Sequence, residues 1–214
     1  MKYWIFSILT AALAYCVGSL NTLVIASNFV FRSNLGKLGK GSAWLTNFLR
    51  VHGAKGFAKL ALVELVKDAV PVIIGGLLFS SGGNAVVGRA LAVFCMVLGR
   101  MYPAIYSFRG SFATAAIAFG SMFVNFSVGA AVLVVCVLVT WATRYLALGT
   151  LAGAVVLAIA SVLIVDHTLA VRLCFLVAVL VLVRTIPSLM RIAAGKEERL
   201  SLEKDISYKF DEKF

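Results

Sequence analysis

Long apolar runs separated by short polar stretches make up most of the chain. A helix that crosses the hydrocarbon core of a bilayer needs about 20 consecutive apolar residues, and most of the runs come close to that length or exceed it. The pattern therefore predicts an all-α polytopic membrane protein with about seven transmembrane helices. The predicted segments are residues 3–30, 58–80, 85–106, 112–126, 128–143, 146–165 and 169–190.

The polar residues between and after these segments divide the chain. Residues 1–191 form the predicted seven-helix membrane domain, whose loops at 31–57 and 100–112 carry the motifs described below. Residues 192–214 form a charged tail, predicted to be cytoplasmic, that contains six of the nine acidic residues. Its mixed charges are typical of a solvated surface helix or a disordered end.

Composition excludes a soluble globular protein. Hydrophobic residues make up 62% of the 214 positions and charged residues only 14%, and the mean hydropathy is +1.01. Soluble domains average about 45–50% apolar and about 25% charged residues. A soluble fold with this composition would expose large apolar patches, which soluble monomers avoid.

The net charge of +11 is explained by where the basic residues fall. Basic chains often bind nucleic acid, but membrane proteins also gather Lys and Arg in their cytoplasmic loops. With seven helices, sixteen of the twenty basic residues lie on one side and three on the other, while Lys67 lies within a helix. The split predicts an N-terminus outside, a C-terminus in the cytoplasm, membrane lipids as partners and no nucleic acid.

The first long loop contains a glycine-rich basic stretch, Gly39-Lys40-Gly41, ahead of a helix-like run. Glycines let backbone N–H groups approach an anion closely, and a helix N-terminus adds positive potential. The stretch is therefore a candidate phosphate site. A flexible basic loop that touches anionic lipid headgroups explains it equally well.

The second apolar segment carries Glu64, Lys67 and Asp68 at spacings that place them on one helix face. Charges in a membrane helix are costly and usually face a polar interior or cavity. Two interpretations stay open at this point. One is a structural ion-pair cluster in which Lys67 neutralises an acid, and the other is a functional site. The charged face is also the one feature that suggests a small transporter.

Few other residues are candidates for a binding, metal or catalytic site. Arg100 and Arg109 in the third loop share the cytoplasmic side, and two arginines suit the bidentate binding of a phosphate. The cysteines lack metal-ligand spacing and are predicted to be buried thiols. They are Cys16, Cys95, Cys136 and Cys174. We predict no metal site and no cofactor, and the residues alone identify no catalytic group.

Three separated motifs carry a further signal through their order. The first loop contains Gly39, Gly41, Thr46, Asn47, Arg50 and Gly53. The second segment reads Glu64-Leu65-Val66-Lys67-Asp68-Ala69-Val70-Pro71. The third loop contains Gly99, Pro103, Phe108, Arg109, Gly110, Ala113 and Thr114. In this order the motifs resemble those of the small bacterial membrane-integral glycerol-3-phosphate acyltransferases that use acyl phosphate as donor, and the likeness covers nearly the whole chain.

Several positions depart from the pattern of that family. Lys40 and Ser42 replace a serine and an asparagine of the first motif, and Arg100 replaces the histidine of the third. A late histidine and asparagine of the family align with Thr185 and Ser188. The resemblance implies that the lost groups lie near the reacting centre, so the chain is expected to be a divergent member with an altered site.

The resemblance implies a multi-pass protein of the bacterial cytoplasmic membrane that makes lysophosphatidic acid from acyl phosphate and glycerol 3-phosphate in phospholipid synthesis. The implied phosphate-binding residues are Gly39, Lys40, Gly41, Thr46, Asn47, Arg50, Arg100 and Arg109, with Glu64 and Lys67 in support. The alternative is a non-catalytic relative that binds a lipid or phosphate ligand or a partner protein, and the replaced positions favour it.

Overall fold

The computed structural model describes residues 2–32, 45–108, 110–197, 199 and 200. These residues form helices joined by short turns, and no strand occurs among them, so the predicted all-α class is confirmed. The helices are α1 (Lys2–Ser19), α2 (Thr22–Ile25), the π-helical η1 (Ala26–Val30), α3 (Leu45–Ser80), α4 (Ala85–Met101), the 3₁₀-helical η2 (Ala104–Tyr106), α5 (Thr114–Val124), α6 (Phe126–Thr143), α7 (Leu146–Ile164) and α8 (Thr168–Ala193).

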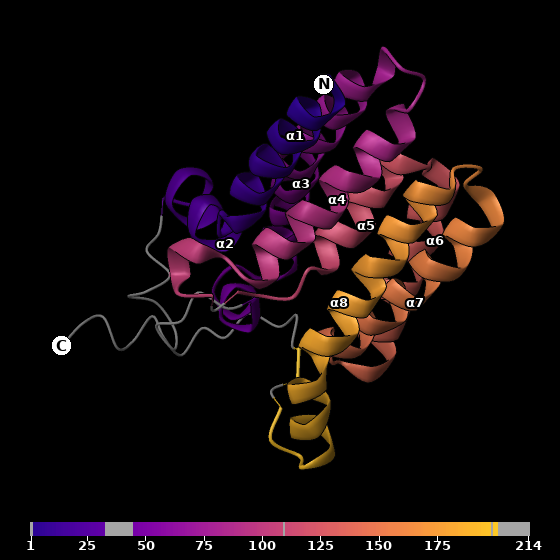
Figure 1. The fold of residues 1–214 in the computed structure, drawn as a ribbon. Helices are drawn as coiled ribbons and strands as arrows, with labels where there is room; N and C mark the ends of the chain where they lie inside the picture. The colour runs from indigo at the N-terminus through magenta and orange to yellow at the C-terminus, as the bar shows by residue number, and fades with distance from the viewer. Residues whose placement is uncertain (1, 33–44, 109, 198, 201–214) are drawn as a thin grey trace.

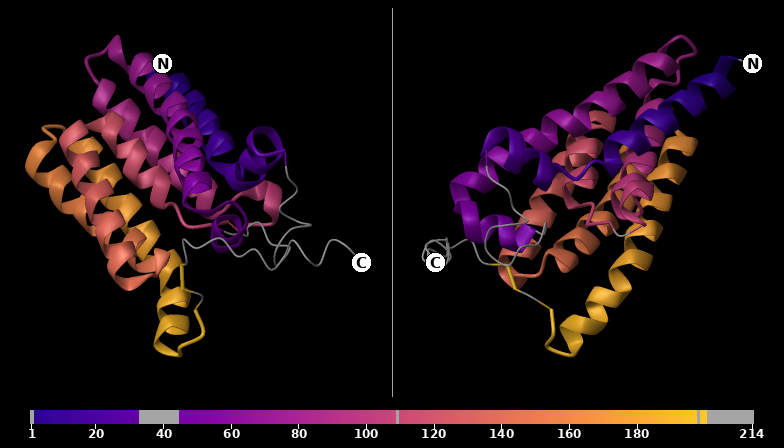
Figure 2. Two further views of the ribbon diagram at one scale, coloured as in Figure 1. Left: turned by 180° about the vertical axis from the view of Figure 1, so that it is seen from behind. Right: turned by 90° about the vertical axis from the view of Figure 1, so that its left-hand side faces the viewer.

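Consecutive long helices run in alternating directions (Figures 1 and 2). The N-terminus and the turn between α3 and α4 lie at one end of the bundle, whereas α2, residues 102–108 and 110–113 and the last turns of α8 lie at the other. α4 is central, because it packs against α1, α3, α5 and α8. Val93, Met96 and Val97 of α4 are each at most 1% exposed. The middle of α4 therefore lies in the core of the bundle.

Close helix packing in the bundle depends on glycines. A Cβ on Gly18 of α1 or on Gly99 of α4 would overlap the backbone of the facing helix. Gly75 of α3 and Gly88 of α4 face one another, and a Cβ on either would overlap the carbonyl oxygen of the other. In a membrane, where helix association rests largely on van der Waals packing, small residues of this kind let two backbones approach closely. The pairs bring α1 and α3 directly against α4.

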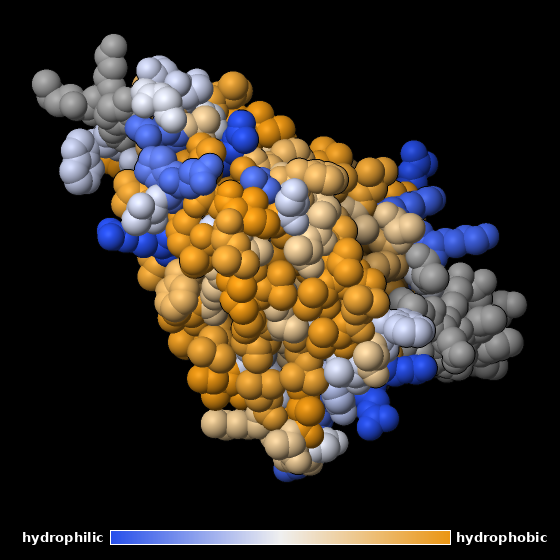
Figure 3. Space-filling view, turned by 90° about the vertical axis from the view of Figure 1, so that its right-hand side faces the viewer, coloured by the Kyte–Doolittle hydropathy of each residue, from blue (hydrophilic) through white to orange (hydrophobic). Residues whose placement is uncertain are grey.

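The outer surface of the bundle is apolar. Figure 3 shows a broad hydrophobic surface with hydrophilic side chains gathered toward its ends. By length and composition, α4, α6, α7 and α8 are able to cross a membrane, and α1 together with the segment Thr22–Val30 forms a bent fifth candidate. α3 carries several charges, and the 11 residues of α5 span about 16 Å of a hydrocarbon core about 30 Å thick. Four or five of the seven predicted spans are supported in this way.

The first predicted segment, 3–30, is not one continuous helix. It breaks after Ser19, and the pieces before and after the break meet at an angle of 58°. The Asn21 side chain caps the new helix, since its Oδ1 accepts hydrogen bonds from Leu23 N at 3.1 Å and Val24 N at 3.4 Å. A short amide side chain that binds nearby backbone N–H groups favours a helix start over a helix interior. The prediction of an unbroken helix was therefore wrong.

The helix at the second predicted segment, 58–80, starts earlier than predicted and contains an interruption. α3 begins at Leu45, inside the predicted loop 31–57, and is interrupted at Gly53, where φ is 66° and ψ is −167°. Only glycine adopts this backbone conformation without strain. Phe48, which is fully buried before the interruption, packs edge-to-face on Phe31 with ring centroids 5.4 Å apart. The first turns of α3 are thus a separate short helix fixed to the end of η1.

The cysteines agree with the sequence prediction at three of four positions. Cys95, Cys136 and Cys174 are buried free thiols. Cys16 lies on the exposed face of α1, so its predicted burial was wrong. The reason is that α1 is apolar nearly all round, which leaves no sequence signal for the face that meets α4.

We expect Gly99→Ala to destabilise the bundle, because the added Cβ meets the backbone of α1 and forces the two helices apart. Overpacking of this kind costs about 1–3 kcal/mol. Thermal unfolding of the purified protein in detergent measures the loss. Gly120→Ala is the matched control, since its Cβ would meet the flexible end of Met96 at 3.0 Å. Equal melting temperatures for the two variants would contradict the packing role.

Candidate functional site

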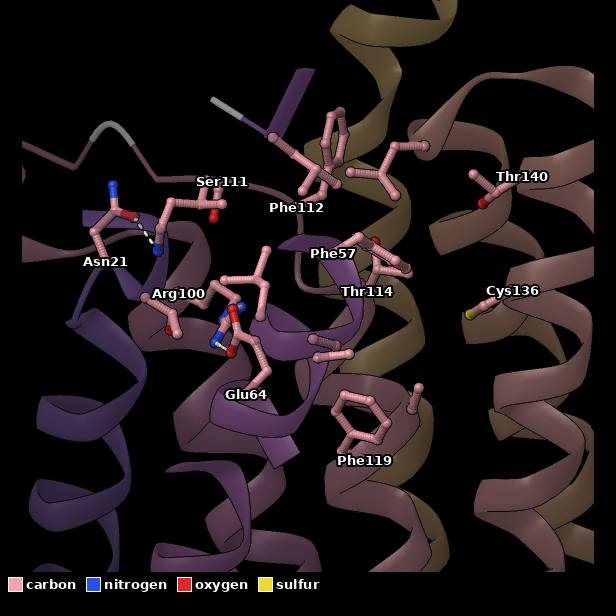
Figure 4. Close-up of a pocket in the computed structure, with 18 of the residues that line it drawn as sticks. Asn21, Phe57, Glu64, Arg100, Ser111, Phe112, Thr114, Phe119, Cys136 and Thr140 are labelled. Atoms are coloured by element: carbon pink, nitrogen blue, oxygen red, sulfur yellow. Dashed lines mark hydrogen bonds and ion pairs between the residues drawn. The ribbon is translucent and has the colours of Figure 1, made fainter. Parts of the chain in front are cut away.

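A cavity of about 850 Å³ lies between the α1–α2 junction, α3, the segment after α4, α5 and α6. Figure 4 shows its two parts. Polar side chains gather on one side, and apolar side chains cover most of the other. The polar side includes Asn21, Thr22, Glu64, Arg100 and Ser111, and the apolar side includes Phe119, Leu133, Cys136, Val137 and Trp141. The cavity is therefore amphipathic.

A buried ion pair forms the floor of the polar side (Figure 4). The Arg100 guanidinium donates from Nη1 to Glu64 Oε1 at 2.7 Å and from Nη2 to Glu64 Oε2. The same Nη2 lies 3.5 Å from Asp68 Oδ1. Glu64 is 7% exposed, Asp68 0% and Arg100 8%. Two parallel bonds between a guanidinium and a carboxylate give a strong and geometrically specific contact.

Lys67 completes the charge balance of this cluster. Its ammonium lies 3.2 Å from Glu64 Oε2 and 3.5 Å from Asp68 Oδ1. It also donates to Thr22 Oγ1 at 2.6 Å. Two cations therefore face two carboxylates, and the hydrogen bond to Thr22 fixes α2 to α3 directly after the break in the first segment.

The contacts of the cluster show that the charged face on α3 forms an ion-pair network. Uncompensated charges inside a membrane bundle are costly, and a buried charge persists when it is paired and hydrogen-bonded. Here α4 supplies Arg100 as a second cation, which the sequence did not connect to α3. The cluster is a structural network, and because Glu64 and Arg100 also line the cavity, it is part of the candidate site as well. Asp68 Oδ2 and Arg100 Nε have no hydrogen-bond partner among the described residues.

The segment after α4 folds back over the end of that helix. Ser111 N donates to Arg100 O at 3.2 Å, and a Cβ on Gly110 would overlap the same carbonyl oxygen. Arg184 of α8 donates from Nη2 to Gly110 O at 3.0 Å. Tyr15 holds the beginning of the segment, since its hydroxyl donates to Tyr102 O at 2.8 Å. These bonds place Ser111 on the cavity wall.

The structure describes some of the predicted site residues and leaves others outside the described part of the chain. Gly39, Lys40, Gly41 and Arg109 lie outside the described residues. Thr46 and Arg50 lie in the short helix that begins α3, but their side chains are likewise outside the description. Asn47 in the same helix is 2% exposed. Arg100 lines the cavity with both Nη atoms bound to acids, and Lys67 forms an ion pair with Glu64.

Sequence reasoning missed several residues that line the cavity. Asn21 and Thr22 were hidden within an apolar run, although two adjacent polar residues in a predicted membrane helix are a signal for a break. Ser111, in the third motif loop, and Arg144, among the basic residues placed on the cytoplasmic side, were not assigned to the site, and both line the cavity. Among the described residues, no group of three His, Cys, Asp or Glu side chains is arranged to hold a metal ion.

The chain matches a known protein-family model. Residues 8–195 match the family model described as glycerol-3-phosphate acyltransferase. The glycerol-3-phosphate acyltransferase of Thermoanaerobacter pseudethanolicus is 28% identical over 94% of this chain and 99% of its own length. That of Francisella tularensis subsp. novicida is 27% identical over 94% of this chain and 95% of its own length.

The fold is similar to two crystal structures of PlsY (YgiH), an integral membrane glycerol 3-phosphate acyltransferase. The glycerol 3-phosphate form has a TM-score of 0.72 and 18% identity, covering 91% of this chain and 96% of that one. The lysophosphatidic acid form has a TM-score of 0.73 and 17% identity, covering 95% and 98%. Together with the apolar surface, the likeness shows an integral, multi-pass membrane fold.

We expect Arg100→Gln to lower the free energy of unfolding by about 3 kcal/mol, because it leaves two buried carboxylates against one ammonium. Adding Glu64→Gln should recover much of the loss, since Lys67 and Asp68 then remain as a balanced pair. Chemical or thermal unfolding in detergent measures both changes. Arg172→Gln on the exposed surface of α8 is the control. A double variant no more stable than the Arg100→Gln variant would refute the pairing argument.

Proposed function

The chain belongs to the glycerol-3-phosphate acyltransferase family, and on this premise we propose that it transfers an acyl group from acyl phosphate to glycerol 3-phosphate. In this reaction a glycerol hydroxyl attacks the acyl carbon, the bond from that carbon to the phosphate oxygen breaks, and the products are lysophosphatidic acid and inorganic phosphate. The observation that carries the proposal is the amphipathic cavity, whose polar side suits a phosphate ester and whose apolar side suits an acyl chain.

Phosphate binding is assigned to residues of the polar loops. Arg50 and Arg109 are proposed to bind the phosphate groups, with Thr46 and Asn47 shaping the pocket around them. The backbone of Gly39 and Gly41 and the charge of Lys40 are proposed to assist. Such groups orient the acceptor hydroxyl and stabilise the leaving phosphate, which are the two main requirements of acyl transfer.

Arg100, Glu64 and Lys67 are proposed to act by shaping the polar side. Because Glu64 and Asp68 hold both Nη atoms of Arg100, its guanidinium is not free to wrap around a phosphate in the way that two loop arginines would. Its contribution is to keep a fixed, charge-balanced floor beneath the substrate. Lys67 supports the same floor through Glu64 and Thr22.

The activity is proposed to differ from that of typical family members. Thr185, where the family pattern has a histidine, is fully buried and its hydroxyl donates to Val181 O at 2.7 Å. A threonine cannot act as a general base near neutral pH. Arg100 stands where the third motif of the family has a histidine, and its ion pair with Glu64 also favours an altered activity. These two observations favour a second candidate, a relative that binds the ligands without turnover.

The membrane arrangement is proposed to contain seven crossings. α3 and α5 would cross together with the five stronger candidates, as parts of one membrane domain over residues 1–191. The N-terminus would then lie outside and the tail 192–214 in the cytoplasm, in agreement with the distribution of Lys and Arg. The proposed location is the bacterial cytoplasmic membrane.

Activity is tested with purified protein, acyl phosphate and glycerol 3-phosphate. We expect lysophosphatidic acid and phosphate to form only when both substrates are present, and Arg50→Ala to lower the rate about 100-fold or more, because a charge that stabilises the leaving phosphate is lost. Arg172→Ala, at the opposite end of the bundle, should leave the rate unchanged. Turnover no greater than in a protein-free control would reject the enzyme, and ligand-induced thermal stabilisation without turnover would identify the binding relative.

Topology is tested with Ser81→Cys and Lys196→Cys, each in a chain whose native cysteines are replaced. In intact cells a membrane-impermeant maleimide should label the cysteine at position 81, in the turn after α3, and should label the one at position 196 only after lysis. Labelling in lysed cells controls for reactivity. Access to both positions from the same side would rule out the seven-crossing arrangement.

A further inference from the structure

The segment after α4, described at residues 102–108 and 110–113, forms much of one cavity wall, although η2 is its one helical turn. The lining residues that it supplies are Pro103, Tyr106, Gly110, Ser111 and Phe112. It folds back on the end of α4, since Ser111 N donates to Arg100 O at 3.2 Å. The conformation of this segment therefore sets the shape of the polar side of the cavity.

That conformation includes strained backbone. Ser107 has a φ of 52° and Phe108 has a φ of 60°. Both values lie in the left-handed region, which residues with a Cβ adopt at a cost. Inside the segment, Phe108 N donates to Pro103 O at 2.9 Å and Ser107 N donates to Ala104 O at 3.3 Å. Strained backbone persists when the surrounding structure fixes it, so contacts from outside the segment are needed to hold it.

Tyr15 of α1 holds the beginning of the segment. A tyrosine hydroxyl is both a donor and an acceptor, and Tyr15 uses both functions on backbone. Its Oη donates to Tyr102 O at 2.8 Å and accepts from Ala104 N at 3.0 Å. Gly99 lets α1 approach this end of α4, because a Cβ there would overlap the carbonyl of Tyr15. One side chain thus fixes the backbone on both sides of Pro103.

Arg184 of α8 contacts both ends of the same segment. Its Nη2 donates to Gly110 O at 3.0 Å. Its guanidinium carbon also lies 6.0 Å from the ring centroid of Tyr102, within the range of a cation–π contact. Because α1 and α8 both pack against α4, the segment is held from two helices of the bundle rather than by its own contacts alone.

We propose that Tyr15 and Arg184 are positioning residues for substrate binding, which fix the segment after α4 in the conformation that faces the cavity. The inference rests on the proposed function and deepens it, because Arg109, assigned above to phosphate binding, directly precedes Gly110 in the chain. Tyr15 and Arg184 are not among the residues that line the cavity. Each therefore acts through the segment and not on the substrate itself.

Tyr15→Phe removes only the hydroxyl, and Arg184→Gln removes the guanidinium. We expect each to raise the KM for glycerol 3-phosphate or for palmitoyl phosphate about tenfold, as the loss of hydrogen bonds that hold the segment predicts, while kcat stays within about twofold. Arg184→Lys keeps a cationic donor for Gly110 O and should recover most of the affinity. The matched controls are Tyr3→Phe, at the other end of α1, and Arg172→Gln on α8.

The two kinetic constants separate positioning from stability. A variant that only folds less well has fewer active molecules, so its apparent kcat falls while both KM values stay the same. Unchanged KM values for both substrates in Tyr15→Phe and Arg184→Gln would therefore overturn the proposal. An Arg184→Lys variant with the same KM values as Arg184→Gln would overturn the assignment of Arg184.

A measurement without turnover keeps the proposal separate from the proposed function. A spin label on Ser107→Cys, in a chain whose native cysteines are replaced, reports the mobility of the segment. We expect Tyr15→Phe and Arg184→Gln to raise that mobility, and Tyr3→Phe and Arg172→Gln to leave it unchanged. Absence of turnover in the wild type would reject the proposed function alone. Equal label mobility in all four variants would reject the positioning role.

Discussion

Glu64 and Asp68 place two carboxylates inside a bundle whose outer surface is apolar, and Arg100 and Lys67 must compensate them. In such surroundings an unpaired charge would cost more than most single contacts contribute. The ion pair joins α3 to α4, and the facing glycines Gly75 and Gly88 let the same two helices approach closely about three turns away. Charge compensation and close packing therefore hold the same pair of helices together.

The same network positions the cavity. Lys67 holds Thr22 at the break between α1 and α2, and the carbonyl of Arg100 accepts the N–H of Ser111 in the segment that folds back over α4. Both walls of the polar side are thus attached to the charge cluster. The apolar side requires no such network, since α5 and α6 provide it with side chains that also face lipid. The cavity is amphipathic because the charge cluster holds its polar side and the side chains of α5 and α6 form its apolar side.

At two positions the resemblance of the sequence motifs implies a histidine, and this chain has Arg100 and Thr185 there. Arg100 is taken up by the ion pair with Glu64, and Thr185 is buried in α8, where its hydroxyl donates to a backbone carbonyl. Arg144, one helical turn beyond Thr140, is a second arginine that lines the cavity.

The sequence by itself determined the helical class, the approximate ends of most segments and the shared face of Glu64, Lys67 and Asp68, because hydropathy and helical period are local properties of the chain. It also located the loop motifs that show the family. It did not reveal that Arg100 pairs with Glu64, 36 positions away, or that Arg144 lines the cavity. Those two features were decided by tertiary structure, because a charge partner and a cavity wall exist only once separate helices have been brought together. The Asn21 cap is local, since its side chain binds backbone N–H groups two and three positions on, but the surrounding apolar run concealed it.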